Sequence, residues 1–201
     1  MDDDPQLNLF SWDRVKVGGG FNALATLDLA KAVRILEDVL SRWPGHPDAS
    51  AGPRMALAWD ASLKEVEALP RKEAAAAFWE RIKAYHFGQG GEPLRQGLIR
   101  RAIALVGSDW SFHLPPDACP GRFLFELEEY GQAEVALTRL LERRPFDGRL
   151  CVCLGNSLFR QGKQSEARLA YAKAFLVAPG EVEREQIDDR ELLNAISEED
   201  N

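Results

Sequence analysis

The sequence contains little that would support a disulfide framework or a metal site. Its three cysteines are an odd number in a chain of 201 residues, which does not favour a set of paired disulfides. Two of them, Cys151 and Cys153, lie two residues apart, and side chains at that spacing on a helix point in different directions. A zinc site needs four ligands, usually in pairs of the form C-x2-4-C or H-x3-5-H. We therefore expect buried, reduced thiols and no metal or other cofactor.

Long hydrophobic runs are also missing. The longest stretch without Asp, Glu, Lys or Arg covers residues 17–27, which is 11 residues. A membrane-spanning helix needs about 20 apolar residues. The first residues, MDDDPQ, are acidic, whereas a secretory signal begins with basic residues. We therefore expect a cytoplasmic protein that does not interact with a membrane.

The chain has no excess of positive charge. Its formal net charge is −7, and residues 181–201 hold nine of the 32 acidic residues but only two of the 25 basic ones. The rest of the chain is therefore neutral. Binding to the phosphates of a nucleic acid needs a basic surface, so we expect no nucleic-acid partner.

Catalytic motifs are missing as well. The stretch LGNSL is not the G-x-S-x-G of a nucleophile elbow, and the glycine-rich stretches VGGGF and GQGG lack the Lys-Ser/Thr of a phosphate-binding loop. His46, His86 and His113 are far apart in the sequence, without a second ligand at metal-binding spacing. A catalytic cleft would have to bring together His86, His113 and Cys119, and nothing in their spacing indicates this. We expect a protein that is not an enzyme and has no catalytic residues.

The sequence is rich in the hydrophobic spacing that is typical of α-helices, with apolar residues three or four positions apart. Asp28 fits an N-cap, and Pro44 fits the stop of the helix that follows it. Residues 1–20, with the glycines of VGGGF, are expected to form a flexible segment. The spacing predicts helices at 28–43, 54–69, 71–87, 92–107, 120–130, 132–144, 149–161, 164–177 and 186–196.

A 34-residue spacing connects the later helices. In the frame 148–181, the small residues Gly155, Ala167 and Ala174 stand where two antiparallel helices would approach each other. Tyr171 is the large residue that fills the gap between the helices, and Pro179 ends the second helix. The frame 114–147 repeats the pattern with Gly121, Ala133, Leu137 and Pro145. A degenerate frame, 76–109, keeps Trp79, Gly90 and Ala102. The pattern resembles the tetratricopeptide repeat.

This resemblance implies an all-α fold, a right-handed superhelical solenoid of helical hairpins over residues 76–181. Helices in 21–75 would pack on one end of the stack, and an acidic helix and tail at 182–201 would cap the other. The helix that ends at Pro44 also reads like the second helix of a repeat, although the preceding glycines leave little room for a full partner. Proteins of this family bind a peptide or protein in their concave groove.

Carried onto this chain, the groove positions of the family are occupied by Arg122, Phe125, Arg149, Asn156, Phe159 and Arg160. The fork of an arginine side chain suits a carboxylate. Members of the family that hold a C-terminal carboxylate have an asparagine at the position of Asn156 but a lysine where this chain has Val152. The sequence thus predicts a non-catalytic interaction module with a protein or peptide partner. The alternative is a structural assembly subunit that contacts partners through its N-terminal helices or its acidic tail. The oligomeric state stays open.

Overall fold

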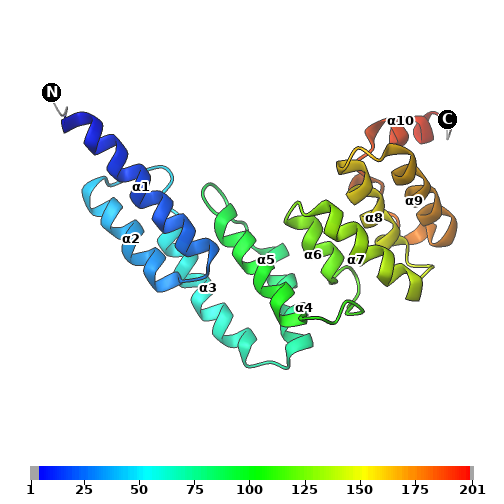
Figure 1. The fold of residues 1–201 in the computed structure, drawn as a ribbon, viewed down its shortest axis with the longest axis horizontal. Coiled ribbons are helices and arrows are strands. Elements are labelled where there is room, and N and C mark those ends of the chain that lie inside the picture. Colours follow the sequence, from blue (N-terminus) through cyan, green and yellow to red (C-terminus); the bar gives the residue numbers. More distant parts are fainter. Residues whose placement is uncertain (1–4, 200–201) are drawn as a thin grey trace. The chain divides into compact units, whose positions relative to one another are not determined.

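The computed structural model describes residues 5–199 of the chain, with side chains described for residues 12–195, and in this part of the chain every regular element is helical (Figure 1). The all-α prediction is confirmed. The α-helices are α1 (Pro5–Ala25), α2 (Leu29–Arg42), α3 (Gly52–Glu67), α4 (Arg71–Ala84), α5 (Glu92–Val106), α6 (Pro120–Glu126), α7 (Tyr130–Arg143), α8 (Gly148–Arg160), α9 (Gln164–Val177) and α10 (Arg190–Glu199).

Aspartate caps set the start of two of the predicted helices. Asp28 caps α2, and its carboxylate accepts a hydrogen bond from the Lys31 amide at 3.2 Å. Asp147 caps α8 in the same way, accepting from the Leu150 amide at 3.0 Å. Such caps satisfy amides that have no partner within the helix. The predicted boundaries of these helices are therefore confirmed to within a few residues.

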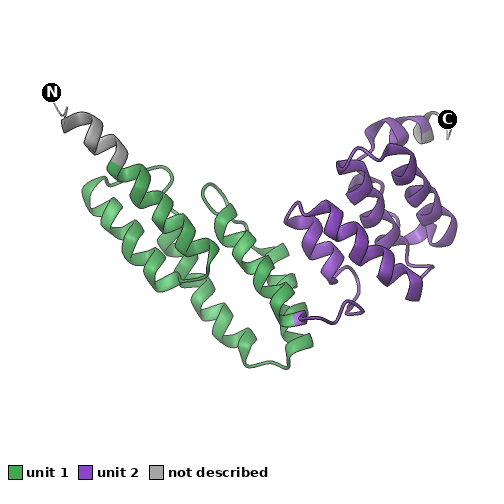
Figure 2. Cartoon of the chain, in the orientation of Figure 1, with its two compact units in different colours: residues 1–105 green, residues 106–201 purple. Residues whose placement is uncertain are grey.

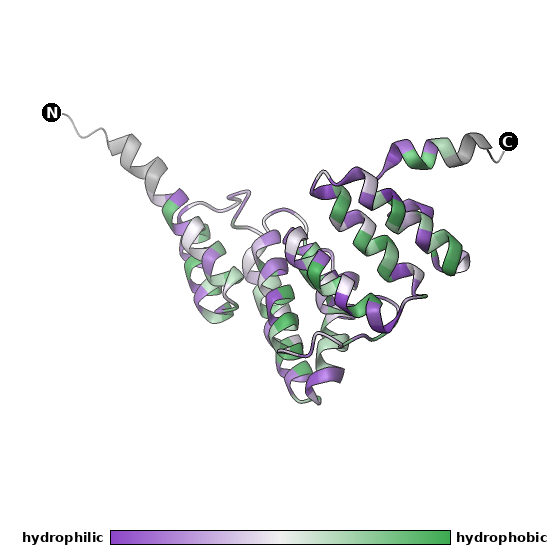
Figure 3. Ribbon diagram, turned by 45° about the vertical axis from the view of Figure 1, so that its right-hand side comes forward, coloured by the Kyte–Doolittle hydropathy of each residue, from purple (hydrophilic) through white to green (hydrophobic). Residues whose placement is uncertain are grey.

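The chain divides into two compact units, residues 1–105 and 106–201 (Figure 2). In the first unit α1 packs on α2, α2 on α3, and α3 on α4; in the second, α6 packs on α7, α7 on α8, and α8 on α9. Helices of both units carry hydrophobic and hydrophilic residues together (Figure 3), as amphipathic helices do. The frame 76–109 lies almost wholly in the first unit, and the frames 114–147 and 148–181 lie in the second.

The expectation of a flexible segment at residues 1–20 is wrong, because helix α1 begins at Pro5 and runs through the three glycines. Residues 1–4 lie outside the described residues. A Cβ atom on Gly20 would lie 2.5 Å from Cδ2 of Leu36, so the glycine allows α1 and α2 to approach closely. Gly20 therefore forms part of a helix-packing surface, and α1 is the missing partner of the helix that ends before Pro44.

The same hairpin occurs three times, as α1/α2, α6/α7 and α8/α9. In each, a Cβ on a glycine of the first helix would come within 2.4–2.5 Å of a large side chain 16 residues later; the pairs are Gly20 with Leu36, Gly121 with Leu137, and Gly155 with Tyr171. Seven residues after each glycine, the chain turns through a residue with positive φ, which is Leu27, Glu128 or Gly162. The recurring glycine thus marks the closest approach within each hairpin.

Hydrogen bonds at these turns explain why α6 is shorter than its predicted range of 120–130. The Glu128 amide donates to the Phe125 carbonyl at 2.9 Å, and the Glu129 amide donates to the Leu124 carbonyl at 3.0 Å. This pattern ends a helix with a residue in the left-handed conformation. Helices α4 and α5 differ from the three hairpins, because Lys83 stands where the frame 76–109 would place the glycine.

Candidate functional site

All six predicted groove residues lie in the second unit. Arg122 and Phe125 are on α6, whereas Arg149, Asn156, Phe159 and Arg160 are on α8. These two helices are the first helices of successive hairpins, and they contact each other. The structure therefore places the six residues on neighbouring elements.

Arg122 and Phe125 form a connected group on α6. The Arg122 guanidinium donates to the Glu126 carboxylate at 2.6 Å, and its central carbon lies 5.5 Å from the centre of the Phe125 ring. The Phe125 ring in turn lies 5.5 Å from the Tyr130 ring. The Nε atom of Arg122 is covered by protein. Arg122 is thus held by the Glu126 carboxylate and lies against the Phe125 ring.

Asn156 does not face an open groove, which corrects the prediction for this residue. Its side chain is 3% exposed. The amide nitrogen donates to the Gln186 carbonyl at 2.7 Å, and the amide oxygen accepts from the Asp188 amide at 3.1 Å and from the Tyr171 hydroxyl at 2.7 Å. Asn156 therefore binds the backbone of residues 184–189, which we call the 184–189 segment.

Two arginines continue this contact along the 184–189 segment. Arg160 of α8 donates to the Asp188 carboxylate at 2.6 Å, and Arg168 of α9 donates to the Asp189 carboxylate at 2.8 Å. Burial raises the pKa of Asp189, but hydrogen bonds from Arg168 and from the Leu192 amide outweigh it, and the pKa is lowered. Asp188 and Asp189 are therefore both held in ion pairs with arginines.

The remaining groove positions on α8 differ in their exposure. Arg149 and Phe159 are half-buried on α8. Val152 stands at another groove position of the family but is 3% exposed, so it belongs to the core. Arg168 was not predicted as a site residue, because the groove positions of the repeat family lie on the first helix of each hairpin and Arg168 lies on the second. Its signal was present in the sequence as a basic residue one helical turn before the hairpin's Tyr171.

The helix predicted at 186–196 begins later, at Arg190. Asp189 caps it, accepting from the Leu192 amide at 3.0 Å. Leu192 and Leu193 are half-buried, and the side chain of Ile196 lies outside the described residues. Arg184–Gln186 form a short 3-10 helix instead. Gln186, Asp188 and Asp189 contact α8 and α9.

The three cysteines are free and buried, as predicted. Burial raises the pKa of Cys153 to about 11, and it also raises the pKa of Cys119 and Cys151. A nucleophilic or metal-binding cysteine works as a thiolate, and these sites disfavour that form. In the described part of the chain, His, Cys, Asp and Glu form no group of three that could hold a metal ion.

The three histidines differ in their exposure and in their contacts. His86 is exposed. His46 is buried, and its Nδ1 accepts from the Asp48 amide at 3.2 Å. His113 is buried in the second unit with its Nε2 3.7 Å from the Asp147 carboxylate, and burial lowers its pKa. Neither ring nitrogen of His113 has a hydrogen-bond partner among the residues that the structure describes.

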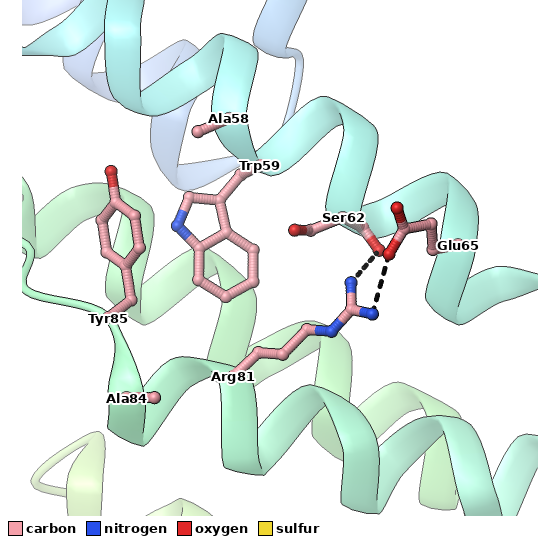
Figure 4. A pocket seen from close by; sticks show the side chains of 7 residues that line it. All are labelled: Ala58, Trp59, Ser62, Glu65, Arg81, Ala84 and Tyr85. Carbon is pink, nitrogen blue, oxygen red and sulfur yellow. Dashed lines mark hydrogen bonds and ion pairs between the residues drawn. The ribbon is translucent and has the colours of Figure 1, made fainter.

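A shallow pocket of about 380 Å³ lies between α3 and α4 in the first unit. Arg81 reaches from α4 to α3, where it donates to the Ser62 carbonyl at 3.3 Å and to the Glu65 carboxylate at 2.8 Å (Figure 4). Trp59 and Tyr85 line the pocket, with ring centres 5.4 Å apart. The indole nitrogen of Trp59 is fully covered by protein, so a bound molecule could not reach it without movement of the wall. The pocket is therefore the weaker of the two candidate sites.

Comparisons with known proteins give no family for this chain. No family model matches it, and no curated protein or solved structure is significantly similar to it. Within residues 5–199, none of the helices combines the length and the apolar composition needed to cross a lipid bilayer. The candidate site is therefore interpreted from its own geometry.

Proposed function

We propose that this protein is a non-catalytic interaction module whose second unit binds an extended segment of a protein partner on α6, α8 and α9. The observation that carries the proposal is the pair of hydrogen bonds from the Asn156 side chain to the backbone at Gln186 and Asp188. An asparagine amide offers a donor and an acceptor, which here pair with the C=O of Gln186 and the N–H of Asp188 on either side of Ile187, a residue in the extended conformation. This site already holds a peptide segment, although here the segment belongs to the same chain.

The repeated hairpins support a tetratricopeptide-like architecture. Three hairpins share the glycine contact, the positive-φ turn and a fully buried alanine at Ala32, Ala133 or Ala167. Stacked hairpins of this kind form extended binding surfaces. We propose that the two hairpins of the second unit follow a right-handed superhelix, with their first helices, α6 and α8, facing the partner.

The state of the cysteines and histidines supports a role without catalysis. Cys119 and Cys153 are buried with raised pKa values, and His113 is buried with a lowered one. A catalytic acid, base or nucleophile must reach its substrate within hydrogen-bond distance. Buried groups of this kind act on stability rather than on a substrate.

The proposal is tested by selecting peptides of about ten residues from a displayed library on the full chain. Affinity is then measured for the wild type and for Arg160→Glu. The matched control is Arg139→Glu, which changes an exposed arginine on α7 in the same unit. We expect Arg160→Glu to weaken binding at least tenfold and the control to leave it unchanged. Selected peptides that bind both variants as well as the wild type would contradict the proposal.

An assembly subunit is the second candidate function, and one observation on α9 favours it. Leu169 and Leu176 lie seven residues apart on this helix and are 73% and 84% exposed. Residues at this spacing share a face of a helix, and exposed apolar residues on one face are typical of an interaction surface. If assembly through α9 is the function, Leu169→Lys combined with Leu176→Lys turns an oligomer into a monomer in sedimentation experiments. A monomeric wild type would exclude self-assembly through α9.

A further inference from the structure

We propose that the partner of the second unit is an extended acidic segment that resembles residues 186–189, in which an apolar residue is followed by two acidic residues. The 184–189 segment is then an intramolecular ligand that the partner must displace. This inference rests on the proposed function and adds the class of partner and its competition with the chain itself.

The backbone contacts define the direction and register of a bound segment. Asn156 binds the carbonyl of Gln186 and the amide of Asp188, which are the residues on either side of Ile187. The Tyr171 hydroxyl donates to the same Asn156 oxygen and so holds the side chain in position. These bonds read no side chain of the segment, so they place no demand on its sequence beyond a C=O and an N–H on either side of one extended residue.

The side-chain contacts define the sequence of the segment. Ile187 is fully buried, so the position between the two backbone bonds requires an apolar residue. The next two residues pair with Arg160 and Arg168, which lie on α8 and α9. Charge-assisted bonds between arginine and carboxylate are stronger than neutral ones. The site therefore prefers an apolar–acidic–acidic sequence.

The 184–189 segment is held weakly enough to be released. Its first three side chains are exposed, and within residues 181–195 only Ile187 and Asp189 are buried. Regions with few buried apolar contacts open more readily than the rest of a fold. A short connection still gives the segment an effective concentration of about 1 mM at its own site. A free peptide must compete with this effective concentration. We therefore expect the peptide to bind weakly unless the contact between the segment and its own site is weakened by substitution.

The experiment uses a fluorescently labelled peptide with the sequence of residues 183–195, EREQIDDRELLNA, and measures its anisotropy with the full chain. Ile187→Ser combined with Asp188→Lys weakens the intramolecular contact and leaves α8 and α9 unchanged. We expect this double variant to bind the peptide at least tenfold more tightly than the wild type. Adding Arg160→Glu to it should remove the gain, and a peptide carrying both segment substitutions should not bind.

Equal affinity of the peptide for the wild type and the double variant would overturn the inference, as would a gain that persists with Arg160→Glu. If the double variant loses its helical circular dichroism signal, Asp188→Ser alone takes its place, because it removes an ion pair at a half-buried position. A selected peptide that needs Arg160 but does not compete with the 183–195 peptide overturns this inference and leaves the proposed function standing. If no selected peptide depends on Arg160, both fail.

Discussion

Asn156 is the residue on which both the fold and the binding proposal depend. Its amide connects Tyr171 of α9 with the backbone at Gln186 and Asp188. A buried polar group that loses its partner costs about 1–3 kcal/mol. One side chain therefore contributes to the stability of the last hairpin and also holds the 184–189 segment.

Asn156→Ala should lower the free energy of unfolding by about 1–3 kcal/mol, because it leaves the buried Tyr171 hydroxyl without its partner. Urea unfolding followed by circular dichroism measures this change. Combining it with Tyr171→Phe removes the unpaired hydroxyl and should recover part of the loss. If the single variant is as stable as the wild type, the hydrogen bonds of Asn156 contribute nothing to the fold.

His113 should make the protein sensitive to acid. Burial lowers its pKa in the folded state, so the unfolded chain binds a proton more readily. The stabilising contribution is complete above the unfolded pKa of about 6.5 and is lost as the pH falls below it. We expect the free energy of unfolding to fall as the pH drops through about 6.5, by about 1.4 kcal/mol for each unit of pKa difference.

The substitution His113→Gln tests this assignment, because it removes the titrating group and should flatten the pH dependence. The control is His86→Gln, which changes an exposed histidine in the other unit. The same slope in the wild type and in His113→Gln would show that another group is responsible.

At the scale of helices, the glycines at the closest approach within each hairpin should tolerate substitution by alanine far less well than nearby glycines in open positions. Gly20→Ala places a Cβ 2.5 Å from Leu36, whereas Gly18→Ala meets nothing within 4 Å. Overpacking typically costs about 1–3 kcal/mol, and alanine in an open helical position gains up to about 1 kcal/mol over glycine. Thermal unfolding should therefore show Gly20→Ala destabilised and Gly18→Ala stabilised. Equal effects would mean that α1 and α2 do not meet at Gly20.

The turn of the second hairpin, between α6 and α7, offers the opposite test, in which introducing a glycine should stabilise the fold. Glu128 has φ of 61°, at the position where the third hairpin has Gly162 with φ of 78°. A residue other than glycine in this conformation costs about 1–2 kcal/mol. Glu128→Gly should therefore raise the free energy of unfolding, by up to about 1 kcal/mol after the entropy of the glycine is counted. Gly162→Ala should lower it. A destabilised Glu128→Gly would contradict this view of the turn.

The helices could be predicted from the sequence wherever a local signal marked them, as at Asp28 and Pro44. Helix α1 could not be, because glycines disfavour a helix and their purpose depends on Leu36, 16 residues away. The binding role of Asn156 and Arg160 stays a prediction. Both contact the 184–189 segment of the same chain, and periodicity gave no sign of that contact. The role of Arg168 could not be predicted from local sequence, because it depends on a contact with Asp189, which lies 21 residues later in the chain.

At the scale of the whole molecule, the chain combines two compact units that use the same hairpin. The second unit contains the 184–189 segment and the residues that bind it. Within this segment Ile187 is fully buried, and Asp188 and Asp189 form ion pairs with Arg160 and Arg168.

Hydrogen exchange at the Asp188 amide tests the central claim most directly, because this amide donates to Asn156. In the free protein it should exchange slowly compared with the exposed amides around it. A selected peptide that binds the second unit competes for Asn156, so at saturation the Asp188 amide should exchange at the rate of an unprotected amide. If the peptide binds and the Asp188 amide stays protected, the partner does not use the site that the 184–189 segment occupies.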